Sequence, residues 1–357
     1  MKKNLIALTL LLCSTAAQAE ETLRVYHIGN SLTSSLTLDR VYRLFEQRDI
    51  DYQFGSQISG GKSLIRHLNY TNEPGQKWIS WESNLPKGRT FLPDPNPYDG
   101  QPEPRFGLYD QALKNPVWDK VVFQIYDSSL HDDVTAISGF MDLAISNGTT
   151  NGFYVYSTWP NRPRIMDSAG KATDEPGNLN YAEAWLRTYT ATADDTSKAS
   201  KWNAPSRDYA QKLVDFLNKK YAGLETPIRL IPTGEVLFAL DKKIKRGELP
   251  GLKELAERNP GMVPGLDENT GFADGINVFY ADAIHMNPIP HQGSTIGIFV
   301  MGTTLFTVIS GQNPVGLSGS DYGLDDERDA ELIHAIQQTI WDVVTAEPLT
   351  GITPVNP

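Results

Sequence analysis

Apolar residues recur along this chain with two different periods, and segments of the two kinds follow one another. Short apolar runs rich in β-branched and aromatic residues predict strands, because such side chains fit a pleated, buried surface. Longer segments with apolar residues three and four positions apart predict helices. The predicted strands are residues 23–28, 52–58, 121–126, 153–157 and 227–232. The predicted helices are residues 38–45, 111–114, 134–146, 209–221, 296–309 and 329–345.

The alternation of strands and helices predicts an α/β fold. A mostly parallel sheet covered by helices on both faces is the arrangement that such an order favours. Sheets of this kind bind ligands at the carboxyl ends of their strands. Residues 29–32 directly follow the first predicted strand, so we expect them at such an end.

Three regions do not fit the alternation. Residues 69–106 are rich in Pro, Gly, Asn and Trp, and residues 161–205 and 242–271 read as loops or weak helices. None of the three has an apolar pattern that would form a core of its own. We interpret them as insertions over the functional edge of one domain that spans residues 20–357.

The N-terminus has the pattern of a secretory signal peptide, which we place at residues 1–19. Lys2 and Lys3 precede an apolar stretch at residues 5–12, and residues 17–19 (Ala-Gln-Ala) form a small-residue cleavage signal. The apolar stretch is too short for a permanent transmembrane helix. We therefore expect an exported protein, periplasmic or extracellular, without an integral membrane segment.

Charge and cysteine content narrow the function classes. The net charge is −11 and no basic cluster is present, so nucleic acids and anionic membranes are poor partners. The single cysteine, Cys13, lies in the predicted signal peptide, so the exported chain must rely on its hydrophobic core rather than on disulfides. The chain has no His-Glu-x-x-His motif, cysteine cluster or phosphate-binding glycine loop. Neither a metal nor another cofactor is expected.

Two short motifs contain the three groups of a serine-hydrolase triad. Residues 29–32 read Gly-Asn-Ser-Leu, and residues 282–285 read Asp-Ala-Ile-His. A serine hydroxyl becomes a good nucleophile when a histidine takes its proton, and a carboxylate holds that histidine in the right tautomer. The competing interpretations are a helix cap at Asn30 or Ser31 and a surface turn at residues 282–285.

Both motifs resemble those of one superfamily. Residues 279–287 (Phe-Tyr-Ala-Asp-Ala-Ile-His-Met-Asn) are similar to the last block of the SGNH (GDSL-type) hydrolases, and Ser31 matches their first block. The resemblance implies a flavodoxin-like three-layer α/β/α sandwich. It also implies that Ser31 is the nucleophile, that His285 is the general base and acid, and that Asp282 orients His285.

The other histidines fit these roles less well. His291 is the competing base, but its spacing from Asp282 is less suitable than that of His285. We therefore interpret His291 as a substrate contact or as a residue that supports the site from behind. His27 lies in the first predicted strand and is expected to be structural. No motif surrounds the remaining ones, which are His67, His131 and His334.

The resemblance implies an oxyanion hole with three donors: the serine N–H, a glycine N–H and an asparagine side chain. Residues 59–63 (Ser-Gly-Gly-Lys-Ser) supply the glycine, for which we choose Gly60, with Gly61 as the alternative. The asparagine is missing, because residues 124–129 read Gln-Ile-Tyr-Asp-Ser-Ser. Since losing one donor costs about two to three orders of magnitude in turnover, we expect a substitute. Gln124 has an equivalent amide, and Ser128 is the alternative.

Tryptophans in or beside the insertions suggest a carbohydrate substrate. Exposed indole faces can stack on sugar rings, although each tryptophan can also pin its loop onto the core. Trp159 follows a predicted strand directly and is best placed to line the site. Arg162 and Arg164 come just after it and are candidates for contacting a polar or acidic sugar, or are simply solvated. The tryptophans of this set are Trp78, Trp81, Trp159, Trp185 and Trp202.

These observations predict an exported serine esterase that removes acetyl or similar small acyl groups from a saccharide. Its partner would be the acylated saccharide or another small ester. Two alternatives stay open. One is a lipase or thioesterase that uses the same triad, and the other is a non-catalytic carbohydrate-binding protein that has kept the fold.

Overall fold

The computed structural model describes most of the chain beyond the predicted signal peptide at residues 1–19, which lies outside it. The described residues are 21–69, 80–84, 109–114, 118–126, 128–149, 152–177, 179–190, 192–194, 205–258, 275–286 and 296–354. Within them, no helix has both the length and the apolar character needed to cross a membrane.

A six-stranded sheet with the order β3-β2-β1-β4-β5-β8 forms the centre of the fold. Five of its strands are parallel, and β3 pairs antiparallel with β2 at one edge. The order of the parallel strands is that of flavodoxin-like sheets, which confirms the predicted fold class. The strands are β1 (Glu21–Gly29), β2 (Ile50–Ile58), β3 (Ser80–Ser83), β4 (Lys120–Gln124), β5 (Phe153–Tyr156) and β8 (Arg229–Ile231).

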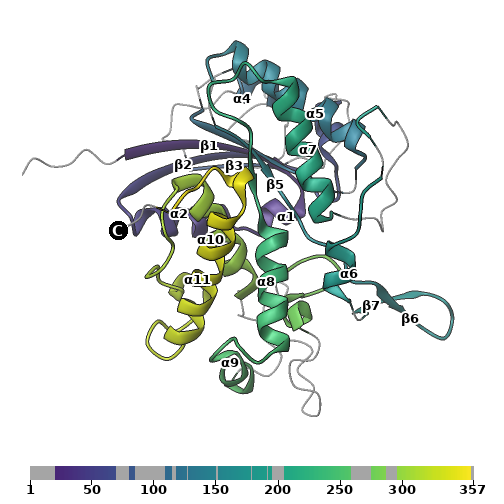
Figure 1. Cartoon of the computed structure of the whole chain (residues 1–357), viewed down its shortest axis with the longest axis vertical. Coiled ribbons are helices and arrows are strands. Elements are labelled where there is room, and N and C mark those ends of the chain that lie inside the picture. The colour runs from purple at the N-terminus through teal and green to yellow at the C-terminus, as the bar shows by residue number, and fades with distance from the viewer. Residues whose placement is uncertain are drawn as a thin grey trace, which may run out of the picture.

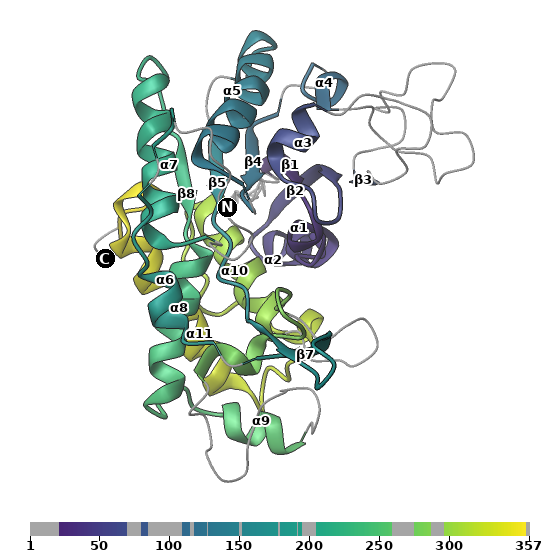
Figure 2. The same ribbon diagram turned by 90° about the vertical axis from the view of Figure 1, so that its right-hand side faces the viewer.

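Helices cover both faces of the sheet (Figure 1). One face carries α3 (Leu64–Leu68), α4 (Tyr109–Ala112), α5 (Leu130–Ser146) and α7 (Arg207–Lys220). The other face carries α2 (Leu38–Glu46), α8 (Thr233–Lys245), α10 (Ile296–Ser310) and α11 (Ala330–Ala346). The view turned by 90° shows the same separation (Figure 2), so the described part of the chain forms the three expected layers.

The alternating side chains of the strands divide the core into two parts. In β1, Leu23 and Val25 belong to the core on the α10 side, whereas Tyr26 and Ile28 belong to the core on the α5 side. Successive side chains of a strand point to opposite faces, so a run that is apolar on both faces suits a strand covered by helices on both sides. This explains why the first strand reads as a nearly continuous apolar run.

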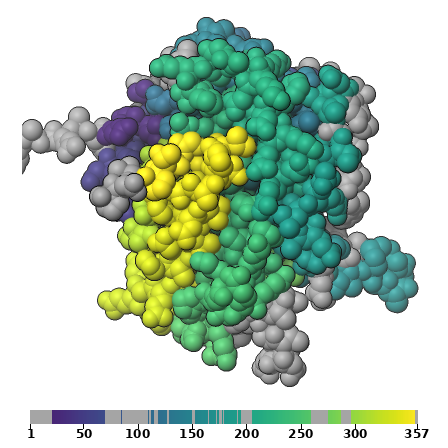
Figure 3. Space-filling view, viewed as in Figure 1, coloured from purple at the N-terminus to yellow at the C-terminus, as the bar shows by residue number. Residues whose placement is uncertain are grey.

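Three of the four helices on the α10 side, α2, α10 and α11, were predicted from the sequence, whereas α8 was not. The apolar face predicted for residues 329–345 is buried in α11, through Leu332, Ile336, Ile340 and Val344. In the space-filling view, α11 (yellow) lies directly against α8 (green), with which it packs (Figure 3). The predicted buried helix at residues 296–309 is α10, and nearly all of its side chains are buried.

The regions interpreted as insertions contain more regular structure than the sequence suggested. The strand β3 lies within residues 69–106, and residues 161–205 include the hairpin of β6 (Arg164–Met166) and β7 (Ala172–Pro176), which projects from the body in Figure 1, and α6 (Tyr181–Trp185). Residues 242–271 begin inside α8 and include α9 (Leu252–Arg258), whose Leu252 and Leu255 are buried in the core. The sequence analysis assigned these residues to loops or weak helices and did not predict that α9 packs on the core.

A buried carboxyl group lies between α5 and α7. Asp133 is only 1% exposed, and its Oδ2 accepts a hydrogen bond of 2.5 Å from the Tyr209 hydroxyl. Burial raises the pKa of Asp133 from 3.8 to about 7, although the hydrogen bond from Tyr209 and the nearby Ser128 hydroxyl oppose the shift. The native protein therefore holds this proton more tightly than the unfolded chain does.

We expect Asp133→Asn to change how stability depends on pH. Because the native pKa is raised, the contribution of Asp133 to stability is full below pH 3.8 and is lost as pH rises through about 7. The unfolding free energy of the variant minus that of wild type should therefore rise by roughly 2–3 kcal/mol from pH 5 to pH 8. Urea unfolding at both pH values measures the difference.

Asp142→Asn is the matched control, since Asp142 is an exposed residue of the same helix and also accepts from a tyrosine, Tyr221. The effect of Asp133→Asn should change with pH by more than the effect of this control. An equal change in the two variants would contradict the prediction.

Candidate active site

The turn that carries Ser31 connects β1 to a short helix, α1 (Ser31–Ser34), as the sequence predicted. Asn30 caps this helix, because its Oδ1 accepts from the Leu32 N–H at 3.0 Å. The side chain of Ser31 is not used for capping, and its hydroxyl has no hydrogen-bond partner among the described residues. We call residues 29–33 the nucleophile turn.

Asp282 and His285 form a tight pair within one loop, residues 281–286, which we call the acid–base loop. Asp282 Oδ2 lies 2.7 Å from His285 Nδ1. The other oxygen, Oδ1, accepts from the N–H groups of Ile284 and His285, each at 2.7 Å. The Asp282 and His285 side chains are 32% and 27% exposed, so a substrate can approach the pair from solvent.

The electrostatics of the pair define the tautomer of His285. Burial alone would raise the pKa of Asp282, but the hydrogen bonds from the His285 ring and from the two N–H groups lower it below its ordinary value. An ionised carboxylate only accepts hydrogen bonds, so His285 Nδ1 carries the proton that points to Asp282. His285 Nε2 is then free to accept a proton on the opposite side of the ring.

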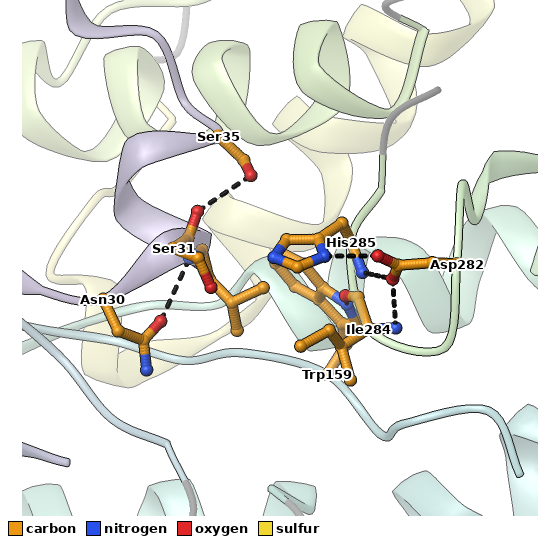
Figure 4. A network of polar contacts seen from close by, with 8 residues as sticks. Asn30, Ser31, Ser35, Trp159, Asp282, Ile284 and His285 are labelled. Atoms are coloured by element: carbon orange, nitrogen blue, oxygen red, sulfur yellow. Dashed lines mark hydrogen bonds and ion pairs between the residues drawn. The ribbon is translucent and has the colours of Figure 1, made fainter. Parts of the chain in front are cut away.

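Ser31 lies on that opposite side. Figure 4 shows the His285 ring between Asp282 and Ser31, with the serine on the side of the ring away from the carboxylate. No hydrogen bond joins the Ser31 hydroxyl to His285 in the described structure. Catalytic hydrogen bonds are often long before substrate binds, so this geometry is compatible with a triad.

The segment after β5 holds the acid–base loop in place. Trp159 Nε1 donates to the Ile284 carbonyl at 2.8 Å, and the Arg162 N–H donates to the Ala283 carbonyl at 2.8 Å. In the other direction, the Tyr280 hydroxyl donates to the Pro160 carbonyl at 2.6 Å. The position of His285 therefore depends on residues that lie far from it in the sequence.

Two backbone N–H groups at the end of the sheet are available for an oxyanion. The Ser31 N–H and the Gly60 N–H each donate to no acceptor within the described residues. Residues 59–62 form a turn next to the nucleophile turn, in which Lys62 N–H donates to Ser59 O and the Lys62 carbonyl accepts from Asn30 Nδ2. Gly61 adopts a φ of +66° there, which favours glycine. Gly60 and Gly61 are both exposed.

The amide of Gln124, the predicted third oxyanion donor, is bonded within the protein. The side chain is 2% exposed, and its Nε2 donates to the Ile125 carbonyl at 3.1 Å. Its Oε1 accepts from the Asn30 N–H at 2.9 Å and from Thr33 Oγ1 at 3.0 Å. Gln124 thus binds the nucleophile turn through Asn30 and Thr33. The alternative, Ser128, lies beside the buried Asp133 carboxyl.

The predicted substrate contacts that the structure describes are buried. Trp159 is 1% exposed and Arg162 is 7% exposed, with its Nε donating to the Gly177 carbonyl at 2.9 Å. Trp185 is 2% exposed and donates to Glu235. These side chains pin loops onto the core, which is the competing interpretation of the sequence. The remaining predicted contacts, Trp78, Trp202, His291 and the side chains of Trp81 and Arg164, lie outside the described part of the chain.

None of the other described histidines bonds to Ser31, Asp282 or His285 in the described structure. His27 is buried with its Nε2 at 2.6 Å from the Tyr52 hydroxyl, and burial lowers its pKa to about 3. Burial likewise lowers the pKa of His67 to about 4. His131 bonds to the Ala193 carbonyl, and His334 is exposed on α11. His27 is structural, as expected from the sequence.

Comparison with known proteins supports the fold but does not assign a family. No protein-family profile and no curated protein sequence matches the chain. A crystal structure of a DUF4886 family protein from Bacteroides uniformis is similar at a TM-score of 0.51 with 14% identity, covering 91% of this chain and 95% of that one. This likeness shows the fold alone.

A second structure, from Slackia heliotrinireducens, is described as a proposed SGNH hydrolase. It is similar at a TM-score of 0.36 with 16% identity, covering 80% of this chain and 98% of that one. A similarity of this size is too weak to support an argument about this chain.

The packing beneath the nucleophile turn predicts that Gly29→Ala destabilises the protein. A Cβ at this position would lie 2.1 Å from Thr33 Oγ1 and 2.7 Å from Gln124 Oε1. Overpacking of this kind costs about 1–3 kcal/mol. Gly60→Ala is the control, because no atom lies within 4 Å of its added Cβ. Urea unfolding of both variants measures the difference, and equal stability of the two would contradict the prediction.

Proposed function

We propose that this chain is an exported serine esterase in which Ser31, His285 and Asp282 form the catalytic triad. The observation that carries the proposal is the 2.7 Å pair of Asp282 and His285, with Ser31 on the far side of the ring. The resemblance of both motifs to the SGNH hydrolases supports the same assignment. The unbonded N–H groups of Ser31 and Gly60 supply two donors for an oxyanion.

The reaction follows from these positions. Ser31 Oγ attacks the acyl carbon while its proton passes to His285 Nε2, and the oxyanion accepts from the Ser31 and Gly60 N–H groups. His285 then gives the proton to the leaving oxygen as the ester C–O bond breaks. A water molecule, activated by the same nitrogen, attacks the acyl-enzyme and restores the Ser31 hydroxyl. Asp282 stabilises the imidazolium in both halves of the reaction.

The acyl group of the proposal is acetyl or a similar small group, and the alcohol is a saccharide. The buried positions of Trp159, Trp185 and Arg162 remove part of the argument for a sugar. The remaining support for a saccharide substrate is the tryptophans at positions 78, 81 and 202 in the sequence and the expected export of an acidic protein.

One observation favours a second candidate, a lipase or thioesterase. Ile165 and Met166 on β6 are 47% and 58% exposed, and Leu186, just after α6, is 50% exposed. These apolar side chains belong to the segment that follows Arg162, which bonds to the acid–base loop. Exposed apolar groups of this kind suit contact with an acyl chain rather than with a sugar.

The nucleophile is tested by Ser31→Ala in purified protein lacking residues 1–19. Hydrolysis of 4-nitrophenyl acetate should fall by about three orders of magnitude or more, because the triad members act as a unit. Ser34→Ala is the control, since Ser34 is an exposed serine of the same short helix and should leave the rate unchanged.

A fluorophosphonate probe gives an independent readout of the same residue. Wild type and Ser34→Ala should be labelled and Ser31→Ala should not. If wild type neither hydrolyses the ester nor reacts with the probe, the esterase proposal is wrong and the binding-protein alternative takes its place.

The two substrate classes predict opposite chain-length preferences. A carbohydrate esterase should have a higher kcat/KM for 4-nitrophenyl acetate than for the octanoate, and it should release acetate from an acetylated polysaccharide. A lipase or thioesterase should prefer the octanoate, and Met166→Ser should weaken that preference. A preference for octanoate with no release from the polysaccharide would contradict the saccharide proposal.

A further inference from the structure

We propose that Gln124 is a positioning residue, which holds Ser31 in register with His285 through a hydrogen-bonded bridge across β4 and β5. The inference rests on the proposed function, because it concerns the same triad. It assigns a role to a residue that touches neither the substrate nor the reacting atoms.

At one end of the bridge, Gln124 holds the nucleophile turn on both sides of Ser31. Its Oε1 accepts from the Asn30 N–H, just before the serine, and from Thr33 Oγ1, just after it. Gly29 makes this possible, because any larger residue would place a Cβ 2.7 Å from the same oxygen. Both donors are buried, so water does not compete for the bonds.

At the other end, the bridge reaches the acid–base loop. Gln124 Nε2 donates to the Ile125 carbonyl at 3.1 Å, and Thr158 Oγ1 donates to the same carbonyl at 2.9 Å. Thr158 is followed by Trp159, whose Nε1 donates to the carbonyl of Ile284, the residue before His285. A single run of contacts therefore connects the two halves of the triad.

The bridge matters because Ser31 and His285 are not bonded directly to each other in the described structure. No hydrogen bond between the described atoms of Ser31 and His285 fixes their separation. That separation is instead determined by the buried groups on which both loops rest, namely Gln124, Thr158 and Trp159, at 2%, 0% and 1% exposure. Misplacement of a catalytic group by about 1 Å can cost about 100-fold in rate, so such support matters for turnover.

Glutamine is suited to this position by its chemistry. The oxygen must accept two hydrogen bonds and the nitrogen must donate one to a carbonyl, which also defines the orientation of the amide. An ionised glutamate would direct a second acceptor at the Ile125 carbonyl, and methionine would offer neither group. Asparagine would be one methylene too short to span the same donors.

The test is Gln124→Met in the protein lacking residues 1–19, assayed with 4-nitrophenyl acetate. We expect kcat to fall 10- to 100-fold while KM changes less than about twofold. The rate of labelling by the fluorophosphonate probe should fall in parallel, because that reaction requires the same alignment of Ser31 and His285.

Gln337→Met is the matched control. Gln337 is a buried glutamine of α11 whose Nε2 donates to the Leu317 carbonyl at 2.7 Å and whose Oε1 accepts from the Gly316 N–H at 3.0 Å. It should lower the melting temperature as Gln124→Met does but leave kcat unchanged. An equal kcat in the two variants would overturn the positioning role.

If Gln124→Met does not fold, Thr33→Val is the variant to measure, because it removes one bond to the Gln124 oxygen and preserves the side-chain shape. It should lower kcat with KM unchanged. If Gln124→Met folds, adding Thr33→Val to it should lower kcat no further. A wild-type kcat in Thr33→Val, or fully additive losses in the double variant, would overturn the bridge.

The outcome also separates this inference from the proposed function. If wild type is labelled at Ser31 and Gln124→Met is labelled equally fast, only the bridge is wrong. If wild type is not labelled at Ser31, the esterase proposal is wrong and the bridge falls with it.

Discussion

The candidate site depends on the central place of β1 in the sheet. This strand pairs in parallel with β2 along its whole length, so that Gly29 lies opposite Ile58, and with β4 through Ile28 and Phe123. Because its backbone groups are shared with two neighbours, β1 cannot slip without breaking both ladders. The nucleophile turn, the turn at residues 59–62 and Gln124 therefore meet at one edge of the sheet.

Much of this arrangement could be predicted from the sequence because it is encoded locally. The apolar runs and helical periods gave the five parallel strands and the helices α2, α5, α7, α10 and α11, although α8 was not predicted. The parallel topology follows from the order of these elements. Asp282 and His285 could be paired because three residues separate them within one loop. Ser31 could be placed because a strand ends directly before it.

The supporting residues could not be predicted, because their roles depend on distant partners. An amide at the end of a strand can face a substrate or the next loop, and the partners of Gln124 are Asn30 and Thr33. An indole beside a site can stack on a sugar or donate to a buried carbonyl, and Trp159 does the second. Thr158 was missed altogether, since nothing in its sequence neighbourhood marks it.

The acid–base loop is held from outside through its main chain, and this has a consequence for how the protein can evolve. The groups that bind Trp159 and Arg162 are the carbonyls of Ile284 and Ala283, which every amino acid possesses. Position 284 is partly exposed and can therefore accept many residue types. Position 283 is buried and can accept only small residues. Selection on this loop should therefore preserve its backbone conformation together with Asp282 and His285, and homologues should diverge most at position 284.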